Sequence, residues 1–132
     1  MNNINDKRIK IREFTDLNVW KEGHKLVIMI YKITDKFPRK EFSLMDQMKR
    51  AAVSITSNIA EGFGRQGFRE KIQFYYLAQG SLTELKNQTL IAKDVNLITN
   101  NDVVSLNNQL SLVHKLLQGL ITKSKTFINL KS

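Results

Sequence analysis

The sequence has 132 residues, the length of a single domain, and its 42% hydrophobic and 25% charged residues are ordinary for a globular protein. Cysteine is absent, which excludes a disulfide framework and a thiolate metal site, and no apolar run approaches the roughly 20 residues of a membrane span. The formal net charge of +9 favours polyanionic partners such as RNA, DNA or an acidic protein surface, although a basic protein without such a partner has the same composition. We expect a cytoplasmic protein.

Helix breakers are scarce, because the chain has 6 glycines and Pro38 is its single proline. This scarcity favours long helices over short strands joined by turns. We expect a basic N-terminal arm over residues 1–14, a helical bundle over residues 15–128 and a C-terminal tail over residues 129–132.

The first helix is expected to begin at Asp16, a good N-cap residue, and to end near Phe37, because Pro38 cannot continue it. Residues at three- and four-residue spacing predict one buried apolar stripe, formed by Leu17, Trp20, His24, Val27, Ile28 and Tyr31. A lone histidine on such a stripe is more often a hydrogen-bonded core or interface residue than a metal ligand.

The second helix is expected to begin at Ser43, with Asp46 completing a capping box. Its predicted buried face consists of Leu44, Met48, Ala51, Ala52, Ile55 and Ile59. Gly62 is expected to end this helix at the C′ position, because glycine adopts the left-handed conformation without steric cost.

The pattern is helical again from Phe68 to about Asp94. The expected inward residues of this third helix are Ile72, Tyr75, Tyr76, Leu82, Leu85 and Ala92. Gly80 lies near its middle, where glycine costs about 1 kcal/mol relative to alanine. Its presence indicates either that another helix crosses close by or that the chain tolerates the defect.

The fourth helix is expected to begin at Thr99 or Asn100, with Asp102 reinforcing its N-terminus. Apolar residues keep an alternating spacing that is typical of bundle seams, at Val103, Leu106, Leu110, Val113, Leu117 and Leu120. His114 lies beside this seam and has the same interpretation as His24. Asp102 is the last acidic residue, so the later lysines complement the negative end of the helix, at Lys115, Lys123, Lys125 and Lys131.

Short connections make neighbouring helices antiparallel, so the sequence predicts an all-α, up-down four-helix bundle. Nothing in it predicts an enzyme. Glu61, His24 and His114 are too few and too scattered for a metal or acid–base motif, and the glycines near Phe63 lack the spacing of a phosphate loop. We expect no cofactor, no metal and no small-molecule substrate.

Two basic clusters are candidates for nucleic-acid binding. Arg65, Arg69 and Lys71 surround the start of the third helix, where free N–H groups also favour anions. Phe63 and Phe68 beside them either offer stacking faces to a single-stranded base or, as we prefer, fix the loop to the core. The second cluster lies in the arm, at Lys7, Arg8, Lys10 and Arg12, where a solvated tail is the alternative.

The stretch from Gln47 to Arg65 combines small residues with isolated polar ones, which need specific partners near a core. A carboxylate at Glu61, in the last turn of a helix, opposes the helix dipole. Arg50 is eleven residues away and about 16 Å along the axis, so it cannot pair with Glu61 within one helix. We expect both to join a structural network with another helix or another subunit.

These residues resemble those of a known family. The segments from Asp16 to Trp20, Gln47 to Arg65 and Gly80 to Leu85, together with Phe37-Pro38, are similar to the four-helix-bundle proteins encoded in intervening sequences of bacterial 23S rRNA genes. The most specific element runs from Ser57 to Arg65. Thr56 stands where such proteins are expected to have proline or a small apolar residue.

The resemblance implies a homopentameric ring. A related branch is the accessory protein of diversity-generating retroelements, a basic pentamer that works with a reverse transcriptase and nucleic acid. Carried over to this chain, the motif residues hold subunits or helix ends together, at Arg50, Asn58, Glu61, Gly62 and Arg65. We expect a non-enzymatic oligomer that binds RNA or DNA mainly through phosphates, or alternatively an adaptor that docks a partner enzyme such as a reverse transcriptase.

Overall fold

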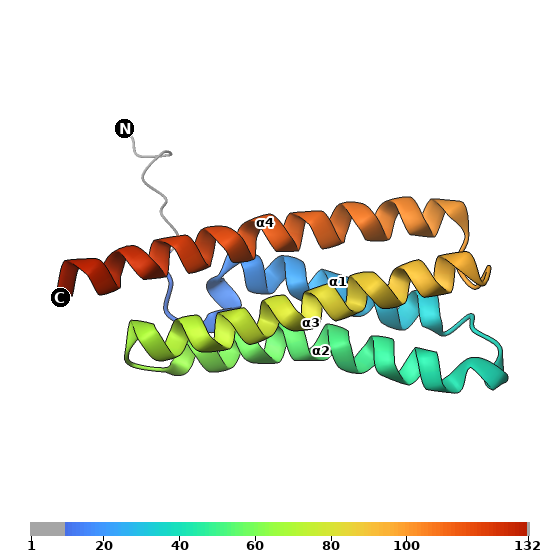
Figure 1. The fold of residues 1–132 in the computed structure, drawn as a ribbon, viewed down its shortest axis with the longest axis horizontal. Helices are drawn as coiled ribbons and strands as arrows, with labels where there is room; N and C mark the ends of the chain where they lie inside the picture. Colours follow the sequence, from blue (N-terminus) through green and yellow to red (C-terminus); the bar gives the residue numbers. More distant parts are fainter. Residues whose placement is uncertain (1–9, 132) are drawn as a thin grey trace.

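The structure, a computed structural model, describes residues 10–131. It is a bundle of four long helices in chain order: α1 (Asn18–Thr34), α2 (Phe42–Gly64), α3 (Phe68–Asp94) and α4 (Asn100–Lys131). Short 3-10 turns precede α1 and α2, η1 (Phe14–Asp16) and η2 (Arg39–Glu41), and the described residues contain no strand. Each long helix packs against two neighbours, and α1 and α4 close the up-down bundle (Figure 1). The expected helical class is confirmed.

The start of α1 differs from the prediction. Leu17 is the N-cap of α1, and it supplies no side-chain bond. Asp16 instead lies at the end of η1, where its carboxylate accepts bonds of 3.0 Å from the backbone N–H groups of Arg12 and Glu13. These bonds lower the pKa of Asp16. Asp16 therefore fixes the chain before the helix. α1 also ends at Thr34, since residues 35–37 form the turn that leads into Pro38.

The buried face of α1 is also different from the predicted stripe. Its core residues are aliphatic, at Val19, Leu26, Val27, Ile30 and Ile33. His24, Ile28 and Tyr31 are exposed. The helix has apolar residues on two adjacent stripes, and the stripe without polar atoms lies inward because its burial costs no desolvation.

The predicted inward face of α2 is confirmed, but its ends are not. α2 begins at Phe42 without a capping box: Ser43 Oγ accepts a bond from Gln47, and Asp46 binds Arg50. Gly62 is not a C′ residue, because α2 continues to Gly64 and no described glycine has positive φ. Instead, Gly62 is buried against α3.

The predicted bounds of α3 are confirmed, whereas two of its residues lie differently. Tyr76 is exposed. A Cβ on Gly80 would meet nothing within 4 Å, so no helix of this chain crosses there. In α4 the expected cap is present, since Thr99 Oγ1 accepts a bond from the Asp102 N–H, and the helix continues to Lys131, beyond the predicted limit at 128.

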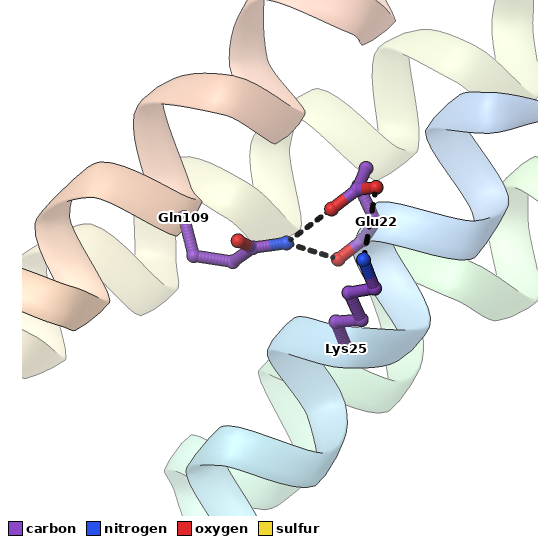
Figure 2. Close-up of polar contacts among 3 residues, drawn as sticks. All are labelled: Glu22, Lys25 and Gln109. Carbon is purple, nitrogen blue, oxygen red and sulfur yellow. Dashed lines mark hydrogen bonds and ion pairs between the residues drawn. The ribbon is translucent and has the colours of Figure 1, made fainter.

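Several polar contacts join neighbouring helices, among them one between α1 and α4 and one between α2 and α3. Gln109 of α4 donates one bond of 2.8 Å to the backbone oxygen of Glu22 and one of 3.0 Å to its Oε1, while Lys25 lies 3.4 Å from Oε2 (Figure 2). Ser54 of α2 and Ser81 of α3 lie 2.8 Å apart at their hydroxyl oxygens. These contacts fix the register of α1 against α4 and of α2 against α3.

Candidate nucleic-acid interface

The structure brings the two predicted basic clusters to one end of the bundle. This end carries the α2–α3 loop, the start of α1 and the last turns of α4 (left in Figure 1). η1 packs against α2, so the arm residues Lys10 and Arg12 lie at the same end as Arg69. Both are exposed, and Lys7 and Arg8 lie outside the described residues.

Arg65 is held in place by several groups. Its Nη2 lies 3.2 Å from Glu61 Oε2, its Nη1 lies 4.0 Å from Glu70 Oε2, and its guanidinium lies 4.7 Å from the Phe74 ring centroid. The side chain therefore links the end of α2 to the start of α3. Its charge is largely balanced before any ligand arrives.

Lys71 has a structural partner. Its Nζ donates a bond of 2.6 Å to the Phe63 carbonyl oxygen and lies 3.5 Å from that of Gly62. Burial lowers the pKa of Lys71. Because the last carbonyls of a helix carry partial negative charge, the ammonium caps the C-terminal end of α2.

The two phenylalanines at this end lie in contacts within the bundle. Phe68 stacks on Phe127 of α4, with ring centroids 4.8 Å apart. The Lys71 ammonium lies 5.3 Å from the Phe63 centroid and 5.9 Å from that of Phe68. Phe68 therefore joins the start of α3 to α4, and Phe63 contacts the Lys71 ammonium; that both rings fix the loop to the core remains a prediction.

The exposed cations at this end, which we call the basic end, include Lys10, Arg12, Arg69, Lys123 and Lys125, and Lys115 lies beside the start of α1. No ion pair involves them among the side chains that the structure describes. Lys115 and Lys123 line a shallow hollow with Leu17 and Asn18 at the start of α1. Sequence reasoning assigned these two lysines only to the helix dipole, because it could not show that α4 passes the start of α1.

The opposite end of the bundle is more balanced in charge. Its connections carry acidic residues beside the basic ones, at Asp35, Glu41, Asp46, Asp94 and Asp102. Lys36 Nζ lies 3.8 Å from Asp102 Oδ2 there.

The motif residues have partners within the chain. Arg50 Nε lies 2.9 Å from Asp46 Oδ2, which raises the pKa of Arg50. Asn58 donates bonds to the Ser54 backbone and hydroxyl oxygens, at 2.9 and 3.1 Å, and so extends the Ser54–Ser81 contact. Thr56 is buried and donates to the Val53 carbonyl oxygen, so a hydroxyl is accommodated within a regular helix.

The two histidines make separate contacts in different parts of the bundle. His24 stacks on Trp20, with centroids 4.8 Å apart. His114 Nδ1 lies 3.4 Å from Lys86 Nζ, and burial together with this lysine lowers the pKa of His114. No cluster of three or more potential metal ligands occurs among the described residues. In the same part of the chain, no helix has the length and apolar character needed to span a membrane.

These features define a small all-α protein, a four-helix bundle with one basic end. The sequence model of the 23S rRNA-intervening sequence proteins matches residues 15–119, and the chain belongs to this family. The fold is similar to the crystal structure of a protein of unknown function from the S23 ribosomal protein family of Bacteroides thetaiotaomicron VPI-5482. The two share 25% identity and a TM-score of 0.72 over 78% of this chain and 97% of that one. No curated protein matches the chain significantly.

Proposed function

We propose that this protein is a non-enzymatic homo-oligomer that binds RNA or DNA mainly through phosphates. The observation that carries the proposal is the basic end, where Lys10, Arg12, Arg69 and Lys123 are exposed and, unlike Arg65, have no ion pair among the described residues. Neutralising phosphates with such cations releases counterions and gives binding with little sequence preference. Among the described residues, His24 stacks on Trp20 and His114 faces a lysine, and the proposal assigns neither histidine a catalytic role.

Charge reversal tests the location of this surface. The double variant Arg12→Glu/Arg69→Glu is expected to weaken binding to RNA and DNA at least tenfold in low salt, because each lost contact removes counterion release. The matched control Lys93→Glu/Lys40→Glu makes the same charge change at the opposite end of the bundle and is expected to change affinity much less. Equal losses in both double variants would contradict a localised basic surface.

The outer face of α3 supports self-association. Leu77 and Ile91, which are 57% and 43% exposed, lie on this face together with Tyr76, Leu90 and the open Gly80. Glycine lets a second helix approach closely, and exposed apolar side chains gain free energy when a partner covers them. A second copy covering this face would explain why a long helix keeps a central glycine. The family resemblance implies a ring of five copies.

Light scattering tests the assembly. A pentamer would have five times the chain mass of 15.3 kDa. We expect Leu77→Glu and Ile91→Glu to reduce the mass toward that of the monomer, because a charge cannot be buried unpaired in an apolar interface. Val104→Glu, at another exposed apolar position on α4, is the control. A monomeric wild-type protein would refute self-association.

The same face of α3 favours a second candidate function, an adaptor that docks a partner protein. In that case the purified chain stays monomeric and binds nucleic acid poorly even in low salt. A partner enzyme such as a reverse transcriptase would then protect Leu77 and Ile91 from solvent. Hydrogen exchange of α3 with and without the partner distinguishes this from self-association.

A further inference from the structure

Three aromatic rings next to the basic end contact one another in series, and we call them the aromatic ladder: Phe14, Trp20 and His24. The Phe14 ring of η1 meets Trp20 edge to face, with centroids 5.5 Å apart, and His24 stacks on the other part of the Trp20 ring system. Phe14 is 36% exposed and His24 is exposed as well. These rings are part of neither the buried core nor the phosphate contacts proposed above.

Phe14 also borders an open hollow of about 620 Å³ against α2. Three small residues line it, Ser57, Ala60 and Gly64, and they leave room for a flat ring beside Phe14. The remaining lining groups are Glu61 and Arg65. The hollow therefore lies on the stretch from Ser57 to Arg65, the most specific element of the family resemblance.

The hollow and its surroundings differ in charge, and this difference suits the two parts of a nucleotide, the neutral base and the charged phosphate. Inside it, Glu61 and Arg65 form an ion pair at 3.2 Å, so the lining is nearly neutral and suits an uncharged group. Outside it, Arg12 and Lys10 are exposed cations that precede Phe14 in the chain. A neutral, partly aromatic hollow beside free cations matches a base flanked by its phosphates.

We propose that the hollow receives an unpaired base of a single-stranded nucleic acid, which stacks on Phe14 while Lys10 and Arg12 hold the adjacent phosphates. This inference rests on the proposed function and narrows its ligand to strands with unstacked bases. A duplex keeps its bases stacked and cannot place one in the hollow without the cost of unpairing it.

Trp20 provides a local probe, because it is the only tryptophan of the chain and touches Phe14. Fluorescence of the full-length protein would be titrated with a ten-nucleotide oligothymidylate and with an abasic oligomer of the same length, while anisotropy of labelled oligomers reports binding. We expect the oligothymidylate to change Trp20 fluorescence and to bind about tenfold more tightly, since stacking one base on an aromatic ring strengthens binding by a factor of about 5 to 150. The abasic oligomer binds through phosphates and leaves the fluorescence unchanged.

Two variants sharpen the test. Phe14→Ala removes the stacking face, and Ser57→Leu fills the hollow while leaving the ladder intact. Both are expected to reduce oligothymidylate affinity about tenfold and to leave abasic binding unchanged. Phe42→Ala, at a 62% exposed phenylalanine at the far end of the bundle, is the matched control.

The outcomes are distinguishable. Equal binding of both oligomers with no fluorescence change would overturn the stacking site and leave phosphate binding in place. Failure of every oligomer and of duplex DNA to bind in low salt would overturn the proposed function and this inference together.

Discussion

Gly62 of α2 packs against the Cδ1–Cε1 edge of the Tyr75 ring of α3. A Cβ on residue 62 would come 2.7 Å from Tyr75 Cε1 and 3.0 Å from the Phe74 Cβ. The two helices approach closely here because residue 62 has no side chain. Burial under this contact raises the pKa of Tyr75 to about 12.

Gly62→Ala is therefore expected to destabilise the protein by about 1–3 kcal/mol, because the added methyl group overpacks the α2–α3 contact. Gly119→Ala is the control, since a Cβ there would meet nothing within 4 Å. That substitution is expected to stabilise α4 by up to about 1 kcal/mol through helix propensity. Urea unfolding measures both, and a stabilising Gly62→Ala would contradict the close approach.

Gln109→Leu is expected to cost about 1–3 kcal/mol at neutral pH, because it removes two hydrogen bonds to Glu22 across α1 and α4. The bond from Gln109 is the main cause of the lowered pKa of Glu22, followed by Lys25. A lowered carboxyl pKa contributes stability that is present above 4.5 and lost as the pH falls through the folded-state pKa. The stability difference between wild type and variant should shrink in acid, and an equal difference in neutral and acidic urea titrations would be evidence against this role.

A second pH dependence of stability is expected from His114, a basic group whose pKa is also lowered in the folded protein. Its folded-state pKa lies below 6.5, so the unfolded chain binds its proton more readily than the folded chain. Stability from this residue is complete above 6.5 and declines as the pH falls below it. His114→Gln should flatten the thermal stability profile between about pH 7 and about pH 5. An unchanged profile would show that the decline has another source.

Lys71 and Arg69 are neighbours on α3 with separate expected roles. Lys71→Met should lower the free energy of unfolding by about 1–2 kcal/mol, because the Phe63 carbonyl oxygen loses its 2.6 Å bond. Arg69→Met should change stability by less than about 0.5 kcal/mol and weaken nucleic-acid binding. Denaturation and binding assays on both variants check the division. A reversed pattern would place the phosphate contact at Lys71 instead.

The sequence predicted the bounds and buried faces of some helices better than those of others. It predicted the bounds of α3 and the buried seam of α4 correctly, although α3 also has exposed apolar residues on its outer face, among them Leu77 and Ile91. On α1 it placed Leu17, Trp20 and Val27 inward correctly, but it also placed His24, Ile28 and Tyr31 inward, and these are exposed on an adjacent stripe. Periodicity alone cannot choose between two adjacent stripes.

The candidate site was predicted residue by residue but not as a surface. Arg69 and the arm were named from their charge, whereas their place at one end with Lys115 and Lys123 depends on tertiary packing. The hollow beside Phe14 was likewise not predicted, because its lining residues come from η1 and α2, which are some forty residues apart in the chain. Glu61 was expected to find a partner on another helix or another subunit, and within this chain it pairs with Arg65, the residue that follows α2.

The most direct test of the central claim is the salt dependence of binding. The association constant of the wild-type protein for single-stranded RNA and duplex DNA would be measured by anisotropy from about 20 to about 300 mM salt. Phosphate binding predicts that log K falls linearly with log salt, by about 0.9 for each phosphate contacted on the duplex and about 0.7 on the single strand. An affinity that is absent at the lowest salt, or that does not change with salt, would contradict a protein that binds nucleic acid through its basic end.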